Sequence, residues 1–354
     1  MALRDAHLAL GAALAPDGIP LHYGDQAGEY RAALAGAVAL DRSHEARLAL
    51  AGGQRLDLLH RISTNDLNSL PAGAGRPTVF TDAAARILDR AVVYHLGEQA
   101  LLLGEPGRGA PLAAYLGRNI FFSDDVRLSN LAASHHLLDI HGPQAAALLP
   151  ALWPGAPPAP DELRAAAVTV GGVPVIAASR RPLSGCRWTL VVPQDGAPAV
   201  WNALIAAGLL PAGSLTYNVL RIRAGVPGAG RELSADYLPL EVGLWDEISF
   251  SKGCYTGQEI IARMESRGRL AKTLVRLDLA RMIDAPAPLF CDGKQAGQLT
   301  SSARSPLGEV FAVGVVRLAQ AQPGQALTAG ADGVPATVAA LIGAQPPYLA
   351  GPAT

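Results

Sequence analysis

The sequence has few cysteines and lacks the paired spacings that would indicate a disulfide framework or a closed metal site. Cys186, Cys254 and Cys291 are far apart in a chain of 354 residues, and no two of them form a C-x-x-C pair. This spacing argues against structural disulfides and against a self-contained zinc or four-cysteine cluster site. We therefore expect no resident metal, and a reducing compartment, the cytoplasm.

The sequence also lacks any excess of charge of one sign and any long apolar run. Lysine plus arginine number 29 and aspartate plus glutamate number 30, which gives a net charge of −1. The sequence has no cluster of basic residues that would bind the phosphates of a nucleic acid, so no nucleic-acid partner is expected. The longest weakly polar stretch, residues 165–178, is broken by glycines and a proline and is shorter than the ~20 residues that span a bilayer. The sequence predicts a soluble protein.

Common phosphate and metal motifs are missing as well. No G-x-x-x-x-G-K-[ST] run is present, and no G-x-G-x-x-G run follows a predicted strand. All eight histidines lie at or before His141, and none has the H-E-x-x-H spacing. Because these are the usual nucleotide and zinc signatures, neither ligand is indicated.

The most informative stretch is residues 249–268, which combines a thiol, an ammonium group and three glycines. Thr256 and Glu259 have the spacing of a capping box, which predicts a helix that begins near Gly257 with Thr256 as its N-cap. Cys254 would then lie just before the positive end of the helix dipole, two residues from Lys252. Both neighbours favour the ionised thiol. The alternative is a small buried hydrophobic residue, although the flanking glycines indicate more than packing.

Lys252 to Glu259 reads K-G-C-Y-T-G-Q-E. This run resembles the K-G-C-[FY]-x-G-Q-E signature of the YgfZ family, folate-binding proteins of iron–sulfur cluster assembly or repair within the GcvT-like aminomethyltransferase superfamily. The resemblance implies tetrahydrofolate as cofactor and iron–sulfur apo-proteins or assembly scaffold proteins as partners, with a link to tRNA modification. It also implies that Cys254 and Lys252 carry the chemistry.

The resemblance implies an α+β fold, with a folate-binding domain over residues 1–272 in two halves, about 1–130 and 131–272. The sequence pattern changes at residue 273, where short predicted strands with alternating apolar and polar residues begin. This change supports a separate C-terminal domain. Asp292-Gly293 and Asp332-Gly333 predict type I′ hairpin turns between them. We expect a small β-barrel over 273–343 and a disordered tail over 344–354.

Two further segments are similar to family elements. Residues 220–227 resemble the L-R-x-x-x-G-x-P element, and residues 238–244 resemble the P-x-E element, both of which face the pterin in the family. A carboxylate can accept two hydrogen bonds from an aminopyrimidine edge, and arginine can bind the glutamyl tail or the ring, so Glu241 and Arg221 suit such a pocket. A surface cation on a helix is the alternative for Arg221.

The resemblance implies further folate contacts from Tyr255, Gln258, Asp89 and Asn65. For Asn65, which lies in a Ser-Thr-Asn-Asp run, a local turn explains the residue equally well. Asp89 lies within a predicted strand and could instead be an outward polar residue.

Two departures from the family pattern argue against aminomethyl transfer. The pattern has an acidic pair where this chain has Asp89 and Arg90, and it has a Tyr-Thr-Gly-Glu segment where this chain has the sequence around Cys186. A folate-dependent iron–sulfur assembly factor is therefore the preferred hypothesis. The alternatives are a folate-dependent aminomethyltransferase or demethylase module, and a ligand-sensing scaffold without chemistry at Cys254.

Overall fold

The computed structural model describes residues 2–153, 162–268 and 270–345. Contacts within the chain group it into two compact units. The first comprises Met1–Leu59, Leu67–Pro77 and Ala91–Leu220, and the second comprises His60–Asp66, Thr78–Arg90 and Arg221–Thr354. The second unit therefore takes two short segments from the early part of the chain. Most of the expected disordered tail, residues 346–354, lies outside the described residues.

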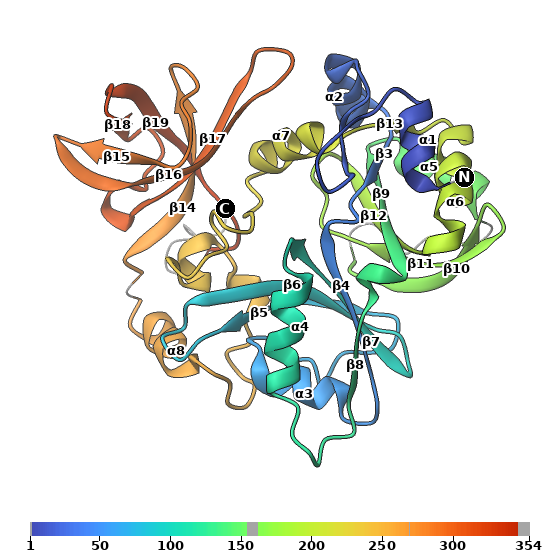
Figure 1. Ribbon diagram of the computed structural model, residues 1–354. Helices are drawn as coiled ribbons and strands as arrows, with labels where there is room; N and C mark the ends of the chain where they lie inside the picture. Colours follow the sequence, from blue (N-terminus) through green and yellow to red (C-terminus); the bar gives the residue numbers. More distant parts are fainter. Residues whose placement is uncertain (1, 154–161, 269, 346–354) are drawn as a thin grey trace. The chain divides into compact units, whose positions relative to one another are not determined.

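A six-stranded sheet forms the centre of the first unit (Figure 1). Its strands, in spatial order, are β10 (Ala165–Val170), β11 (Val173–Ser179), β12 (Cys186–Pro193), β9 (His135–Gly142), β3 (Val38–Asp41) and β13 (Leu210–Pro211). Neighbours are antiparallel except β13, which runs parallel to β3. The tight β10–β11 hairpin turns at Gly171 and Gly172, whose φ angles of +59° and +81° suit glycine.

Helices cover this sheet and bury its apolar side chains. They are α1 (Leu3–Ala9), α2 (Gln26–Ala35), α5 (Ala145–Leu152) and α6 (Ala197–Ala206). Trp153, Trp188 and Trp201 are almost fully buried in the resulting core. Burial of such large side chains is a main source of the stability of this layer.

A five-stranded sheet is formed by strands within residues 45–130. Its spatial order is β5 (Gly75–Thr81), β6 (Ile87–His95), β7 (Gln99–Pro106), β4 (Glu45–Ala51) and β8 (Arg127–Asn130). The remaining elements of this part of the chain are α3 (Arg55–Ile62), α4 (Gly109–Arg118), α7 (Ser214–Ala224), a small ribbon of β1 (Ala13–Leu14) and β2 (Pro20–His22), and the 3-10 turns η1 (Leu131–Ala133) and η2 (Gln194–Gly196).

The C-terminal part of the second unit is a closed six-stranded barrel, drawn in orange and red in Figure 1. The strands follow the order β14 (Lys272–Leu279), β17 (Val310–Arg317), β16 (Lys294–Arg304), β15 (Ala287–Cys291), β18 (Ala326–Ala329) and β19 (Val334–Leu341), with the 3-10 turn η5 (Leu318–Gln320). The α+β fold with a small barrel, as expected from the sequence, is confirmed.

The two Asp-Gly dipeptides of the barrel behave differently. Asp292 and Gly293 have φ angles of +49° and +74° between paired Cys291 and Lys294, as a two-residue type I′ turn requires. The same prediction for Asp332-Gly333 is wrong, because β18 and β19 are joined by four residues, 330–333. The extra residues remove the need for a positive φ at position 332.

Between α7 and the barrel the chain forms short 3-10 turns, η3 (Pro239–Val242) and η4 (Trp245–Glu247), and one helix, α8 (Gln258–Ser266). These elements carry the motif segments singled out from the sequence. None of the helices in the described ranges has the length and apolar character needed to cross a membrane.

Candidate functional site

Cys254 lies in an extended loop between η4 and α8, and its side chain is exposed. Its sulfur has no hydrogen-bond or charged partner in the part of the chain that the structure describes. The loop therefore presents a thiol to solvent instead of burying it. The alternative in which Cys254 is a small core residue is wrong.

The capping box predicted for Thr256 is also wrong. Helix α8 begins at Gln258, and its N-cap is Gly257, in the left-handed region at φ +85° with no side-chain cap. A Cβ at position 257 would lie 2.6 Å from the carbonyl oxygen of Asp82, so only glycine fits this approach. Thr256 contributes through its carbonyl, which accepts a hydrogen bond of 2.6 Å from the Thr81 hydroxyl.

Lys252 attaches the cysteine loop to the end of helix α3. Its ammonium group donates to the carbonyl oxygens of His60 and Ser63, the latter at 2.6 Å, and lies 4.9 Å from the centre of the Tyr255 ring. Burial lowers the pKa of Lys252 to about 8, against the opposing effect of the Asp66 carboxylate. The cation therefore acts on helix-end carbonyls, a favourable position for it.

Tyr255 fixes the loop from the other side of Cys254. Its ring is 8% exposed and packs in an apolar cluster of Ala85, Leu240, Trp245, Ile248, Ile261 and Leu270. Burial raises the pKa of Tyr255 to about 12, so the phenol is neutral at physiological pH. Gln258 adds a longer hydrogen bond of 3.4 Å from Nε2 to the carbonyl oxygen of Lys252. Tyr255 and Gln258 thus contribute to the structure of the loop.

The turn that contains Asn65 is bonded to the segment that leads into the cysteine loop. The hydroxyl of Thr64 donates a hydrogen bond to the carbonyl oxygen of Glu247 at 2.8 Å. The backbone carbonyl of Thr64 accepts a hydrogen bond from the amide of Ser249 at 3.0 Å. Asn65 Oδ1 accepts a hydrogen bond from the amide of the next residue, Asp66, at 2.9 Å, and the amide of Asn65 donates to the Thr78 hydroxyl at 3.0 Å. The structure therefore brings Asn65 and the cysteine loop into one framework.

Asp89 and Arg90 lie on β6 with different surroundings. Asp89 is 5% exposed, and its Oδ1 accepts from the amide of Arg90 at 3.0 Å. Arg90 forms a bidentate pair with the fully buried Glu247, with distances of 2.7 Å to Oε2 and 2.6 Å to Oε1. The cation that stands where the family has its second acid is thus neutralised within the protein.

Glu241 is 4% exposed in η3. Its Oε2 accepts a hydrogen bond from the amide of Leu238 at 3.0 Å, which fixes the start of this turn. Its Oε1 accepts no hydrogen bond from any residue in the described ranges. One oxygen of a nearly buried carboxylate is therefore left to receive a donor from a ligand.

Arg221 has a different environment from the one expected for a ligand-binding residue. Its Nη1 donates to the carbonyl of Val226 at 2.9 Å and to Glu232 at 3.3 Å, and its Nη2 donates to Ser301 at 3.2 Å. Glu232 is fully buried and also accepts from the Ser301 hydroxyl at 2.7 Å. Arg221 thus ties the turn after α7 to barrel strand β16, and a folate contact from it stays a prediction.

All eight residues selected from the sequence belong to the second unit. They are Asn65, Asp89, Arg221, Glu241, Lys252, Cys254, Tyr255 and Gln258. Cys254 offers a nucleophilic thiol, Glu241 offers a hydrogen-bond acceptor, and most of the others hold the loops that carry these two groups. No cluster of three or more histidine, cysteine or acidic side chains suited to a metal occurs in the described residues.

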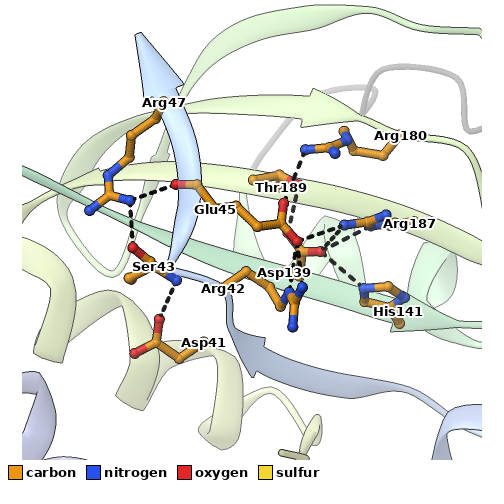
Figure 2. A network of polar contacts seen from close by, with 10 residues as sticks. All are labelled: Asp41, Arg42, Ser43, Glu45, Arg47, Asp139, His141, Arg180, Arg187 and Thr189. Carbon is orange, nitrogen blue, oxygen red and sulfur yellow. Dashed lines mark hydrogen bonds and ion pairs between the residues drawn. The ribbon is translucent and has the colours of Figure 1, made fainter. Parts of the chain in front are cut away.

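The first unit contains a buried ionic cluster that was not predicted from the sequence (Figure 2). Its centre is Asp139 on β9, which is fully buried. Oδ2 of Asp139 accepts from Arg187 Nε and Nη2 at 2.9 and 2.7 Å, and Oδ1 accepts from the Thr189 hydroxyl at 2.5 Å. His141 Nε2 lies 3.1 Å from Oδ2. The signal in the sequence is a carboxylate that lies between two apolar residues, Leu138 and Ile140, within a strand.

Two more arginines join this cluster through Glu45. Arg42 bonds Glu45 Oε1 at 2.7 Å and stacks 3.5 Å above the ring of Tyr217, and Arg180 lies 3.6 Å from Oε2. Burial opposes ionisation of both carboxyl groups. Even so, Arg42, Arg180 and Arg187 hold the pKa of Glu45 below its usual range, and Arg187, His141 and Arg180 do the same for the pKa of Asp139. Burial lowers the pKa of His141, so this ring is neutral. The cluster is a compact ionic link across the central strands.

Comparison with known families decides the affiliation of the chain. The family described as GCVT N-terminal domain matches residues 4–252, which is well over half of the sequence. The chain belongs to this family. The GCVT match ends at Lys252, at the start of the cysteine loop.

Relatives and solved structures agree with this affiliation. A protein of Arabidopsis thaliana named "Putative transferase At1g60990, chloroplastic" is 31% identical over 84% of this chain and 69% of its own length. An aminomethyltransferase of Streptomyces avermitilis is 30% identical over 92% of this chain and 91% of its own. The crystal structure of glycine cleavage system aminomethyltransferase T from Bartonella henselae shares the GCVT fold, with a TM-score of 0.82 at 23% identity over 95% of each chain.

Proposed function

We propose that this protein binds reduced folate and supports the assembly or repair of [4Fe–4S] clusters in other proteins, as a YgfZ-type member of the GCVT family. The observation that carries the proposal is the exposed thiol of Cys254 on a loop fixed by Lys252 on one side and Tyr255 on the other. An accessible thiol is the group that binds iron or attacks sulfur. The clusters and their apo-proteins or scaffolds are the cargo.

The polar groups of the second unit suit a reduced folate. Glu241 offers one carboxylate oxygen without a protein donor, and the aminopyrimidine edge of a pterin carries N–H donors for such an oxygen. When bound, tetrahydrofolate supplies ring amines that carry or accept a one-carbon unit. Glu241 would orient the ring, and Asp89 is the further carboxylate candidate.

We further propose a reducing compartment, the cytoplasm. Within the described residues, none of Cys186, Cys254 and Cys291 takes part in a disulfide. An exposed thiol that acts in its reduced form needs surroundings that keep it reduced.

Aminomethyl transfer, or a related folate-dependent transfer, is the second candidate, and the names of the relatives favour it. Such a reaction needs carboxylates beside the folate amines to stabilise developing positive charge. This chain retains Asp89 but has Arg90 at the next position, and Arg90 binds both carboxylate oxygens of the buried Glu247. The iron–sulfur role therefore ranks first.

The deciding experiment separates the thiol from the folate site. Cys254→Ser is expected to bind tetrahydrofolate as the wild type does in calorimetric titration. It is also expected to lose the ability to restore [4Fe–4S] enzyme activity to a strain that lacks its YgfZ-type protein. Cys291→Ser, which changes a cysteine in the barrel, is the control and should retain both properties. Full rescue by Cys254→Ser would exclude the thiol role.

A further inference from the structure

A small pocket lies on the barrel in the second unit, and none of the eight residues selected from the sequence lines it. It has a volume of about 190 Å³ and is bordered by strands of the barrel and by the segment before η3. Its lining residues are Tyr237, Lys272, Gln295, Ala296, Gly297, Gln298, Val315 and Arg317. The lining includes two cationic side chains, Lys272 and Arg317, and no carboxylate. The pocket therefore favours a negatively charged ligand.

The two cations face each other across neighbouring strands. Lys272 on β14 is the direct antiparallel partner of Arg317 on β17, so their side chains project to the same side of the sheet. Neither forms an ion pair or a side-chain hydrogen bond with any residue in the described ranges, and both are exposed. Like charges directly opposite each other destabilise a strand pair. An anion between them would reverse that repulsion.

Neutral donors surround the pair. Gln295 and Gln298 are exposed amides, and neither forms a side-chain hydrogen bond with another described residue. The ring of Tyr237 is 5% exposed and lies 5.8 Å from the ammonium group of Lys272. Its pKa is raised to about 12, mainly by burial and further by Asp236, Glu232 and Glu241, so its hydroxyl keeps its proton.

The carboxylates near Tyr237 do not neutralise the pocket. Glu232 is bonded to Arg221 and to Gly228, and Glu241 is bonded to Leu238. Asp236 accepts from Ser234, and no ion pair joins it to Lys272 within the described chain. The pocket therefore keeps its two positive charges.

We propose that this pocket binds the phosphate group of a phosphate monoester. Two adjacent cations match the charge of about −1.5 to −2 that a phosphate monoester carries at neutral pH, whereas one carboxylate would balance only one of them. The guanidinium group and the amide donors suit its three terminal oxygens. This inference concerns a separate site and does not depend on the proposed folate or thiol chemistry.

The test uses the full chain and three probes, namely inorganic phosphate, phenyl phosphate and succinate, in calorimetric titrations. The wild type is expected to bind one phosphate or phenyl phosphate per chain. Lys272→Met and Arg317→Met should each weaken this binding by about tenfold or more, since each removes a charged donor. Arg276→Met is the matched control, because Arg276 is exposed on the same strand but does not line the pocket. It should bind as the wild type does.

Thermal unfolding provides a second measurement that does not require a binding signal. Phosphate should raise the Tm of the wild type and of Arg276→Met but not that of Lys272→Met. Without phosphate, Lys272→Met should be at least as stable as the wild type, because the repulsion with Arg317 is gone. Equal phosphate binding by all variants would show an adventitious ion only and overturn the proposal. Tighter binding of succinate than of phosphate would overturn the assignment to a phosphate ligand.

Discussion

Lys252 shows how one side chain can hold a reactive loop in place without touching the reactive group. Its ammonium group bonds the carbonyls of His60 and Ser63, while the neighbouring Cys254 stays exposed and unbonded within the described chain. The sequence placed the cation two residues from the thiol and suggested direct activation. The structure instead indicates that Lys252 positions the loop.

A pH dependence follows from the lowered pKa of Lys252. The folded pKa is about 8 and the unfolded value is 10.5, so between these pH values the unfolded chain binds more protons than the folded chain. Stability therefore rises with pH in this window because of Lys252, and below pH 8 the burial penalty is fully present. The free energy of unfolding of the wild type relative to Lys252→Met should increase from pH 8 to 10. Urea titrations at each pH measure it, and a constant difference would contradict this prediction.

Glu241 holds the start of η3 through one carboxylate oxygen and is proposed to bind folate through the other. One substitution can separate these two roles. Glu241→Gln keeps an oxygen that can accept from the amide of Leu238, but it removes the charge and one acceptor from the ligand side. Tetrahydrofolate affinity should fall by roughly ten- to a hundredfold, the equivalent of 1 to 3 kcal/mol for an unmet hydrogen bond. The Tm should change little.

Calorimetric titration of both proteins tests this prediction. Glu265→Gln is the control, because it makes the same exchange at an exposed position of α8 that is not among the predicted folate contacts. Unchanged affinity in Glu241→Gln would place the folate elsewhere.

At the scale of elements, strands β9 and β12 are joined by a buried ion pair as well as by backbone hydrogen bonds. The Asp139–Arg187 pair crosses this strand pair in the middle of the sheet. A buried pair contributes little relative to an apolar pair of the same shape, but removing one partner leaves the other charge uncompensated. The cluster therefore makes the pairing of these strands sensitive to the loss of a single charge.

Asp139→Asn should destabilise the protein by about 3 to 5 kcal/mol, because Arg187 would lose the nearer of its two buried counterions, at 2.7 Å, and keep only Glu45 at 3.8 Å. The control is Asp332→Asn, which breaks an exposed pair with Arg281 and should have a much smaller effect. Denaturant unfolding at neutral pH gives both values. Similar small losses in the two variants would show that the cluster is well solvated.

Acid should reproduce this loss in the wild type. The folded pKa values of Asp139 and Glu45 are lowered, so their contribution is present above the unfolded values, near pH 4, and is lost as the pH falls below them. In Asp139→Asn the acid-dependent part of the unfolding free energy should be smaller than in the wild type.

Element types followed from the sequence where the local signal was strong. The Asp292-Gly293 turn depends on positive φ angles that this dipeptide adopts readily, so the short-range pattern was sufficient there, whereas the same dipeptide at 332–333 lies in a longer loop. The N-cap of α8 was assigned wrongly because a tertiary contact prevailed over a local motif. The close approach of residue 257 to Asp82 requires glycine there, and the two residues are far apart in sequence.

At the scale of the whole molecule, the sequence was sufficient to select residues that lie in one unit. It was not sufficient to predict what each of these residues bonds. All eight residues lie in one compact unit, although they come from segments that include residues 60–66 and 78–90 as well as the region after 221. The sequence could not show that Arg221 and Lys252 bond the protein itself, since their partners are distant or are backbone carbonyls. The ionic cluster was missed for the same reason.

The ranking of functions leads to a prediction for the complete protein in cells. Expressed in a strain without its own aminomethyltransferase T, the chain should not restore growth on glycine as one-carbon source, because the second acid is missing at Arg90. In a strain without its YgfZ-type protein it should restore [4Fe–4S] enzyme activity. Enzyme assays in extracts measure the second outcome directly. Growth in the first strain without rescue in the second would make the transferase the better description.

The pair between Arg90 and Glu247 also limits the mutational routes by which this chain could become an aminomethyltransferase. Exchanging Arg90 alone for an acid would leave Glu247 buried beside another negative charge, at a loss of about 3 to 5 kcal/mol. Exchanging Glu247 first would instead remove both hydrogen bonds between its carboxylate and Arg90. Either first step weakens the fold before any activity is gained, so laboratory evolution one substitution at a time should stall here. A library that varies positions 90 and 247 together avoids that barrier.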